Sequence, residues 1–184
     1  MNIVLVRHGE TIENATGIIQ GQDPGNLSAK GVEQAKVVAK KLSNEHFDRV
    51  ISSDLKRCVD TANEIMQFHS DVPINYAKEL REMNFGDYQG LRSVDIDWDA
   101  LPGDILNRRA PNAESGMEMR QRVVAFINTL LAAYHDETIL IVTHGGPMRN
   151  IKSSIEKTDP LDILADKIDN CAVLRYKIDS LLTA

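Results

Sequence analysis

The chain has 184 residues, of which 42% are apolar and 26% are charged, and its formal net charge is −6. This length and composition suit one globular domain with a sizeable core of its own. The negative balance and the lack of a basic stripe argue against a nucleic acid partner, because such proteins must neutralise many phosphates. No stretch approaches the roughly 20 apolar residues that a membrane-spanning helix needs, so we expect no membrane partner.

The two cysteines, Cys58 and Cys171, show no metal-ligand spacing, and we expect both to be free thiols in a reducing compartment. The apolar run at the amino terminus is too short for a signal peptide and lacks a preceding cationic region. The sequence therefore predicts a cytoplasmic protein. Nothing in its pattern predicts an oligomeric state.

The first half of the chain is expected to alternate between strands and helices. The continuous apolar run at 2–6 predicts a strand that is buried on both faces. A polar, glycine-rich loop is expected over 9–27, and Ser28 is a good N-cap for an amphipathic helix that ends near Asn44. The next predicted elements are a strand at 48–53, a helix over 55–68 with Asp54 as its candidate cap, and a short extended piece at 73–76.

The second half begins with a charged stretch at 79–90 that glycines interrupt. Residues 91–112 show no clean period, and we expect a partly helical excursion of the kind that caps an active site. Ser115 and Glu118 have capping-box spacing, which predicts the start of a helix that runs to about Tyr134. The remaining predicted elements are a strand at 138–142, a helix from Pro147 to about Ile155, a short helix at 161–165 and a strand at 171–178. The pattern indicates one α/β domain over 1–184.

Chemically capable side chains gather where the predicted strands end. They are Arg7 and His8 after the first strand, Arg57 in the first turn of a helix, Glu82 in the charged stretch, and His144 after the strand at 138–142. Ligands of open α/β sheets collect at the carboxyl ends of strands. Each residue alone has an ordinary structural explanation, but together they indicate a site. A guanidinium beside His8 argues against a metal ion and for an anion, such as a phosphoryl group that a neutral imidazole attacks.

Four stretches resemble the motifs of the histidine phosphatase superfamily, which includes cofactor-dependent phosphoglycerate mutases. The first, Leu5-Val6-Arg7-His8-Gly9-Glu10-Thr11, is similar to the Arg-His-Gly signature of that family. The others are Ser52-Ser53-Asp54-Leu55-Lys56-Arg57-Cys58 with Thr61-Ala62, Leu80-Arg81-Glu82-Met83-Asn84-Phe85-Gly86, and Val142-Thr143-His144-Gly145-Gly146. Their order and spacing agree with the family over nearly the whole chain.

The resemblance implies a three-layer α/β/α sandwich around a mixed, mostly parallel sheet. It also implies a histidine acid phosphatase-type phosphomonoesterase, a hydrolase that needs no metal or other cofactor and acts on a small phosphorylated substrate. His8 would be the nucleophile that forms a phosphohistidine, and Glu82 would give a proton to the leaving oxygen. The implied phosphoryl clamp is Arg7, Arg57 and His144, and the implied substrate contacts are Asn14, Gln20, Gly21 and Gly145, the last by letting the backbone approach the phosphate.

Some positions depart from the family pattern, and they bear on the substrate more than on the chemistry. The loop at 23–28 carries an extra small residue or two. Tyr88 and Gln89 stand where the family commonly has tryptophan and glutamate, and Cys58 stands where alanine is usual. We expect residues 91–112 to shape the choice of substrate.

The main alternative is a phosphoglycerate mutase, which would use the same phosphohistidine. Phe85 stands where mutases carry a tyrosine, Gly146 where they carry an asparagine, and the chain is shorter than typical mutases, so a phosphatase is favoured. Arg108 and Arg109 are the contrary evidence, because an arginine pair at similar spacing contacts the substrate carboxylate in mutases. The complete set of candidates argues against a catalytically silent binding module. A Rossmann-type nucleotide binder would need a Gly-x-Gly-x-x-Gly after the first strand, and the chain has none there.

Overall fold

The computed structural model describes residues 1–184, with the exception of the side chain of Leu164. At its centre is a five-stranded sheet with the order β3-β2-β4-β1-β5. The strands are β1 (Asn2–Arg7), β2 (Arg49–Ser53), β3 (Ile74–Ala77), β4 (Thr138–Thr143) and β5 (Val173–Lys177). Strands β1 to β4 pair in parallel and β5 runs antiparallel to β1, which confirms the expected mixed, mostly parallel sheet.

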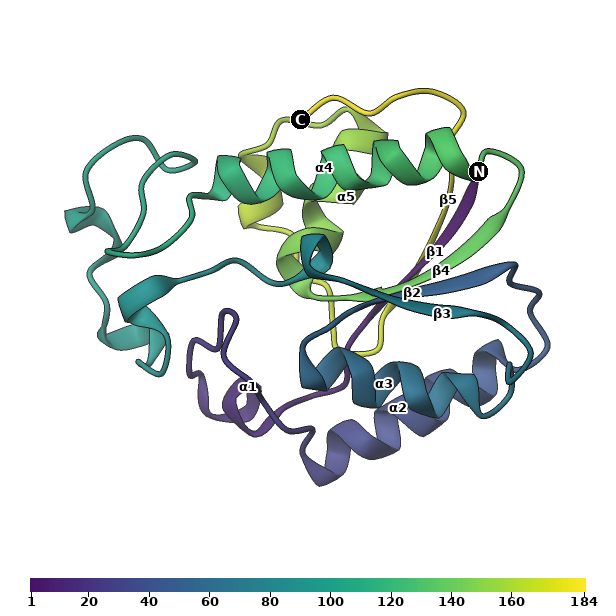
Figure 1. Ribbon diagram of the computed structural model, residues 1–184. Helices are drawn as coiled ribbons and strands as arrows, with labels where there is room; N and C mark the ends of the chain where they lie inside the picture. The colour runs from purple at the N-terminus through teal and green to yellow at the C-terminus, as the bar shows by residue number, and fades with distance from the viewer.

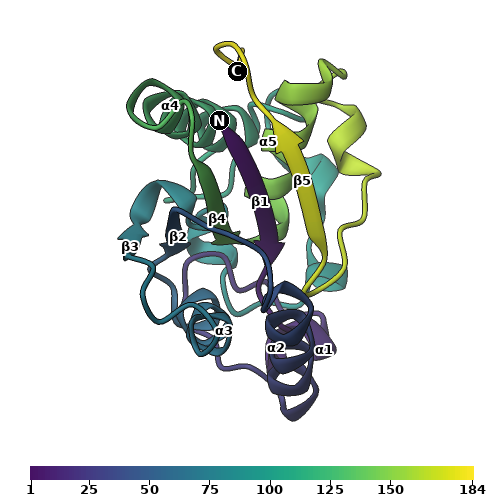
Figure 2. The same cartoon turned by 90° about the vertical axis from the view of Figure 1, so that its right-hand side faces the viewer.

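Helices cover both faces of this sheet, which confirms the expected three-layer sandwich (Figure 1). Helices α2 (Ala29–Leu42) and α3 (Lys56–Met66) lie on one face. Helices α4 (Gly116–Ala133) and α5 (Gly145–Glu156) lie on the other. Figure 2, a view turned by 90°, shows the sheet between these two pairs of helices.

The side chains of the central strands alternate between the two faces of the sheet. Ile3 and Leu5 of β1 join the apolar cluster beneath α4 and α5, whereas Val4 and Val6 join the cluster beneath α2 and α3. All four are at most 4% exposed, so each contributes about 1.5–3 kcal/mol through burial. This burial on both faces is the physical reason for the apolar run at 3–6 within the strand.

Two of the expected helix caps are present. Ser28 Oγ accepts a hydrogen bond of 3.0 Å from the backbone N–H of Gly31 at the start of α2. Ser115 and Glu118 form the reciprocal capping box at the start of α4, with bonds of 3.2 Å and 2.8 Å. Each bond satisfies an N–H group that the first helical turn would otherwise leave unpaired.

The expectation that Asp54 caps the next helix is wrong. Leu55 is the N-cap of α3 and makes no capping bond through its side chain. Asp54 instead accepts two hydrogen bonds of 2.6 Å from Nε and Nη2 of Arg81. A guanidinium offers this carboxylate a charged donor and two parallel bonds, which a backbone N–H at a helix cap does not, and no local sequence pattern indicates the pair.

The stretch at 9–27, expected to be all loop, contains the short helix α1 (Ile12–Thr16). Thr11 Oγ1 accepts from the backbone N–H of Asn14 at 3.1 Å, and Asn14 Oδ1 accepts in return from the N–H of Thr11 at 3.3 Å. This local capping box stabilises a turn that is too short to show an apolar period.

Residues 91–112 contain two short 3-10 helices, Ser93–Asp95 and Trp98–Ala100, as the expectation of a partly helical excursion requires. Figure 1 shows this segment projecting at the left of the sandwich. The other 3-10 helices are Lys78–Leu80, Gly86–Tyr88 and Asp162–Leu164, the last where a short helix was expected. None of the helices in the described part of the chain has the length and apolarity needed to cross a lipid bilayer.

Candidate active site

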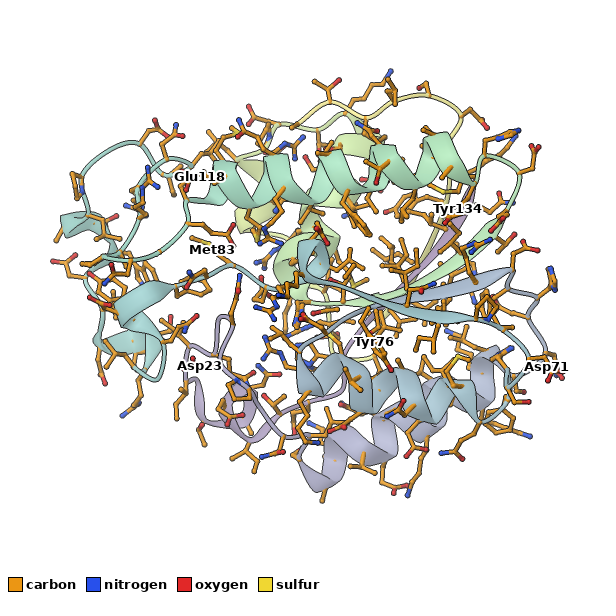
Figure 3. All side chains as sticks on the ribbon, viewed as in Figure 1. Asp23, Asp71, Tyr76, Met83, Glu118 and Tyr134 are labelled. Carbon is orange, nitrogen blue, oxygen red and sulfur yellow. The ribbon has the colours of Figure 1, made fainter. Side chains whose placement is uncertain are left out.

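The segments that follow strands β1 to β4 meet at one edge of the sheet. Asp23 and Met83, labelled in Figure 3, lie on the side of the molecule where these strands end, whereas Tyr134 and Asp71 mark the opposite side. Because β2, β4 and β1 are neighbours and parallel, residues distant in sequence come together at this edge. A pocket of about 210 Å³ opens there, and its walls include Arg7, His8, Arg57 and Glu82.

His8 lies in the wall of this pocket with 3% of its surface exposed. Its Nδ1 is 2.7 Å from the carbonyl oxygen of Gly9. Because a carbonyl only accepts, we assign the ring proton to Nδ1, which leaves the lone pair on Nε2. Burial, followed by the positive charges of Arg57 and Arg7, holds the pKa of His8 well below its usual value of 6.5. At neutral pH the ring is therefore an uncharged imidazole with the electronic form of a nucleophile.

Hydrogen bonds from three other segments fix the backbone around His8. The N–H of His8 donates to the carbonyl of Thr143 at 3.0 Å, and the N–H of Gly9 donates to Thr61 Oγ1 at 3.0 Å. Asn170 Nδ2 donates to the carbonyl of His8 at 3.1 Å. The position of the ring is thus set by β4, α3 and the segment before β5 together.

Two arginines flank His8 without a carboxylate partner. Arg57 is 1% exposed, and its two terminal nitrogens donate to carbonyl oxygens of the loop at 21–23 over 2.7 Å and 2.9 Å. Arg7 Nη1 donates to the carbonyl of Ile168, while its Nε is buried and has no hydrogen-bond partner among the described residues. Burial is the main cause that lowers the pKa of each guanidinium. Because an unpaired buried charge costs several kcal/mol, this arrangement favours an anion as occupant.

His144 lies beside His8, with the two ring centroids 5.1 Å apart, and is fully buried. Its Nδ1 accepts from Arg57 Nε at 3.1 Å, and its Nε2 is 2.8 Å from Ser53 Oγ. Burial, followed by the charge of Arg57, holds the pKa of His144 well below 6.5, so this ring is neutral as well. Both ring nitrogens have partners within the protein. A direct bond from His144 to a phosphoryl oxygen therefore requires one of these contacts to be exchanged.

Glu82 reaches the pocket from the segment after β3. Its Oε1 accepts from the N–H of Met83 at 2.9 Å, and its Oε2 accepts from the N–H of Gly146 at 3.1 Å. A Cβ on Gly146 would lie 2.1 Å from Oε1, so a side chain there would displace the carboxylate. A Cβ on Gly145 would meet Arg7 Nε at an ordinary 3.5 Å. Position 146 is thus the one of the two at which a side chain would clash. The expectation that Gly145 lets the backbone approach a phosphate stays a prediction.

The three expected substrate contacts from the stretch at 9–27 all line the pocket. Gln20 Nε2 donates to Glu13 Oε2 at 2.9 Å, and Gln20 Oε1 lies 3.5 Å from Asn14 Nδ2. Gly21 gives its carbonyl oxygen to Arg57. The two amides therefore form a wall that α1 holds in place, while Gly21 positions the guanidinium.

Sequence reasoning missed Arg149, Ser93 and Trp98, which also line the pocket. Arg149 stands four residues after Gly145 on α5, so the two share one helix face, and this spacing is the signal that points to it. The only hydrogen bond of its guanidinium among the described residues runs from Nη1 to the carbonyl of Asp166, at 3.4 Å. Ser93 and Trp98 come from an irregular segment whose sequence carries no comparable signal.

Phe85 lies in the pocket wall, and its ring centroid is 6.1 Å from that of Trp98. Arg108 and Arg109 line a neighbouring hollow. Arg108 Nη1 donates to Asp99 Oδ1 at 3.1 Å, and Arg109 Nη1 donates to both carboxylate oxygens of Glu118 at 2.8 Å and 2.9 Å. The arginine pair is thus engaged with carboxylates of the chain itself.

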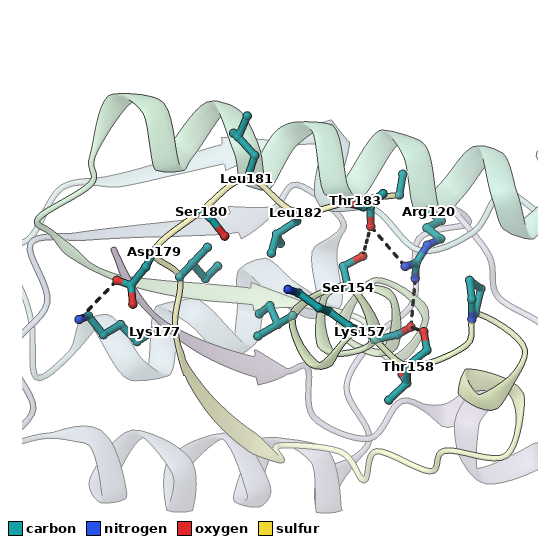
Figure 4. Close-up of a pocket in the computed structure, with 15 residues that line it drawn as sticks. Arg120, Ser154, Lys157, Thr158, Lys177, Asp179, Ser180, Leu181, Leu182 and Thr183 are labelled. Atoms are coloured by element: carbon teal, nitrogen blue, oxygen red, sulfur yellow. Dashed lines mark hydrogen bonds and ion pairs between the residues drawn. The ribbon is translucent and has the colours of Figure 1, made fainter.

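A larger hollow of about 400 Å³ lies between α4, α5 and the segment at 177–184 (Figure 4). There Arg120 Nη2 and Ser154 Oγ both donate to the carbonyl of Thr183. The lining of this hollow includes none of the expected site residues. Within the part of the chain that the structure describes, no three histidine, cysteine, aspartate or glutamate side chains gather to hold a metal ion.

The molecule is thus an α/β sandwich whose pocket at the carboxyl ends of the strands is lined by a neutral histidine and two arginines. The family model of the histidine phosphatase superfamily (branch 1) matches residues 3–181, and the chain belongs to this family. The four stretches that resemble the family's motifs all lie within this match.

Curated relatives include both phosphatases and mutases by name. The adenosylcobalamin/alpha-ribazole phosphatase of Salmonella typhimurium is 36% identical over 152 residues, which cover 79% of this chain and 75% of that protein. The probable phosphoglycerate mutase GpmB of Erwinia tasmaniensis is 32% identical over 181 residues, which cover 95% and 84%. The structure of the alpha-ribazole phosphatase of Shigella flexneri matches with a TM-score of 0.88 and 29% identity, over 97% of this chain and 91% of that one. The choice between the two activities thus depends on the geometry of the site.

Proposed function

We propose that the protein is a metal-independent phosphomonoesterase that acts on a small phosphorylated metabolite through a phosphohistidine on His8. The observation that supports it most is that two cations without a carboxylate partner among the described residues, Arg7 and Arg57, line the same pocket as the unprotonated Nε2 of His8. Fixed cations of this kind stabilise the charge on a phosphoryl group during transfer. The acid phosphatase-type reaction that the motifs imply and the cytoplasmic location are parts of this proposal. The free thiols Cys58 and Cys171 accord with that location.

In the first half-reaction, His8 Nε2 attacks phosphorus in line with the ester oxygen. The N–P bond forms, the P–O bond to the alcohol breaks, and the alcohol leaves with a proton from Glu82. That proton arrives with the substrate, because a phosphate monoester monoanion carries one and the carboxylate of Glu82 accepts it on binding. Arg7 and Arg57 donate to the non-bridging oxygens.

In the second half-reaction, water attacks the phosphohistidine and Glu82 accepts its proton. The N–P bond breaks and inorganic phosphate leaves as its monoanion with the proton that Glu82 had accepted, which restores neutral His8 and the carboxylate of Glu82. Dividing the reaction in this way replaces one very slow hydrolysis by two easier displacements. His144 and Gly21 act by holding Arg57, so that its guanidinium needs no reorganisation when charge develops.

Three features of the site favour a phosphatase over a mutase. Phe85 has no hydroxyl with which to bind a substrate. A side chain at 146, where mutases carry an asparagine, would overlap Glu82 Oε1, and Arg108 and Arg109 are paired with carboxylates of the chain. A silent binding module would have no reason to keep both the unpaired arginines and the unprotonated nucleophile.

The test is the release of inorganic phosphate from a panel of phosphorylated metabolites by the purified protein, with and without EDTA. The panel includes 3-phosphoglycerate with 2,3-bisphosphoglycerate, with 2-phosphoglycerate and free phosphate followed separately. We expect phosphate release that EDTA leaves unchanged. Fast interconversion of the phosphoglycerates with little free phosphate would identify a mutase instead. Activity that EDTA abolishes and Mg²⁺ restores would contradict metal independence.

A further inference from the structure

A second hollow of about 330 Å³ adjoins the catalytic pocket. The two share five lining residues, which are Met83, Phe85, Trp98, Met119 and Arg149. We call this second hollow the side chamber. Because these residues stand in both walls, the two hollows are direct neighbours, and the side chamber lies next to the place where a phosphate beside His8 would be joined to the rest of its ester.

The lining of the side chamber is mainly apolar. Beyond the shared residues it comprises chiefly Leu101, Ile105, Leu106, Ala113 and Met117. The polar N–H of the Trp98 ring is already paired, because Nε1 donates to the carbonyl of Ser93 at 3.2 Å. Its ring meets Phe85 edge to face, with an interplanar angle of 70°, which is a favourable geometry between aromatic rings.

Three of the arginines in this lining have partners for their terminal nitrogens. Arg108 and Arg109 form ion pairs with Asp99 and Glu118. Arg120 donates to the carbonyl of Asn150 and to Ser153 Oγ. Long arginine side chains commonly cover apolar space with their methylene stems while the guanidinium binds outside it. The side chamber therefore offers much apolar surface, and among its lining residues Arg120 Nε and Asn150 Oδ1 are buried polar atoms without a hydrogen-bond partner in the described structure.

We propose that the side chamber binds the alcohol part of the substrate, and that this part carries a flat apolar ring system. The inference rests on the proposed phosphomonoesterase activity and specifies its substrate class. Cavities of about 300 Å³ and larger, lined mostly by apolar and aromatic groups, bind small organic molecules by this kind of contact. Arg149, in the wall common to both hollows, stands where the anionic phosphate meets the apolar remainder. A compact, highly charged ester such as 3-phosphoglycerate leaves the side chamber empty.

The first experiment compares two phosphate esters of primary alcohols, ethyl phosphate and 2-(1-naphthyl)ethyl phosphate. Their leaving oxygens have similar basicity, so differences in kcat/KM report binding of the ring. A single methylene in an apolar pocket changes kcat/KM by about 10- to 200-fold, so we expect the naphthyl ester to be favoured by at least about 100-fold. 3-Phosphoglycerate should rank with ethyl phosphate.

Variants then locate the preference. Ala113→Phe fills the side chamber and Ile105→Asp places a charge in its lining, so each should lower the naphthyl-to-ethyl ratio by about tenfold or more. The matched control is Val94→Asp, on the same segment, where the side chain is 78% exposed and outside the lining. Both substrates are measured on one preparation, so any loss of folded protein cancels in the ratio.

The outcomes separate this inference from the proposed function. Turnover of both esters with a ratio near one, or a preference for 3-phosphoglycerate, would overturn the inference and leave the phosphatase intact. A high ratio that Ala113→Phe and Ile105→Asp do not change would place the ring outside the side chamber and overturn it as well. No phosphate from any ester would contradict the phosphatase itself.

Discussion

The backbone N–H of Gly146 donates a hydrogen bond of 3.1 Å to Glu82 Oε2. The first turn of α5 thus holds the proposed acid, which belongs to a segment more than 60 residues earlier in the chain. The bond needs the absence of a side chain, because a Cβ at 146 would overlap Glu82 Oε1. A helix N-terminus suits this role, since its N–H groups point outward without partners in the helix.

Glu82→Gln should slow alkyl phosphates by about 10²- to 10⁴-fold, which is the usual contribution of a general acid. Glutamine keeps the shape of the side chain but has no proton to give to an alkoxide. Aryl phosphates, whose leaving groups need little protonation, should lose much less. The measurement is kcat/KM across a series of esters of graded leaving-group basicity. Equal losses across the series would argue against proton donation by Glu82.

Gly146→Ala should reproduce the leaving-group dependence of Glu82→Gln, because the new Cβ displaces the carboxylate without removing it. Gly145→Ala is the matched comparison, since its Cβ meets only an ordinary contact, and we expect a much smaller loss. Melting temperatures of both variants check that each is folded. If Gly145→Ala proved the more damaging for alkyl phosphates, the steric requirement would lie at 145 instead.

His8→Ala should abolish turnover, because it removes the unprotonated Nε2 that attacks phosphorus in the pocket lined by Arg7 and Arg57. Wild-type protein quenched during turnover of a labelled ester should carry phosphate that is acid-labile and base-stable, as a phosphohistidine is. The label should be missing from His8→Ala. Label that is instead stable to acid would indicate a different nucleophile.

Much of the fold and of the site follows from local sequence. The strand at 2–6 carries a run of apolar residues because it is buried on both faces. Arg7 and His8 follow this run because polar groups reach a ligand at the carboxyl end of a strand. Ser28 and Ser115 are recognisable because an N-cap acts on its own helix. Such features depend on neighbours within a few residues, so a single sequence shows them.

Other features depend on packing between distant segments, which no local pattern reports. Asp54 has the form of a cap, but Arg81, brought close by the fold, takes its carboxylate. The steric need for Gly146 arises only because Glu82 approaches it. Part of the side chamber is lined by the segment at 91–112, whose apolar residues show no period. The sequence pattern therefore could not predict that Trp98 lines a pocket.

Two of the buried histidines, His8 and His144, should make the protein less stable in mild acid. The pKa values of His8 and His144 are both held well below 6.5, chiefly by burial. As pH falls below 6.5, the unfolded chain therefore takes up two protons that the folded chain does not. The free energy of unfolding should then fall by up to about 1.4 kcal/mol per pH unit for each histidine, in addition to any other titration. Urea unfolding at intervals between pH 7 and pH 5 measures this slope.

His8→Asn and His144→Asn should each reduce that slope by about 1.4 kcal/mol per pH unit, because each removes one group that protonates only on unfolding. Each variant also loses contacts, such as those with Arg57 or Gly9, and these losses change its absolute stability. The dependence of the free energy of unfolding on pH, by contrast, reports only the uptake of protons on unfolding. The control is Val37→Asn, at a position that is 69% exposed, which adds and removes no ionisable group and should leave the slope as it is in the wild type. If His8→Asn has the same slope as the wild type, then His8 takes up its proton at the same pH in the folded and unfolded chains. It would then be cationic in mild acid, and the neutral nucleophile on which the proposed mechanism depends would be lost there.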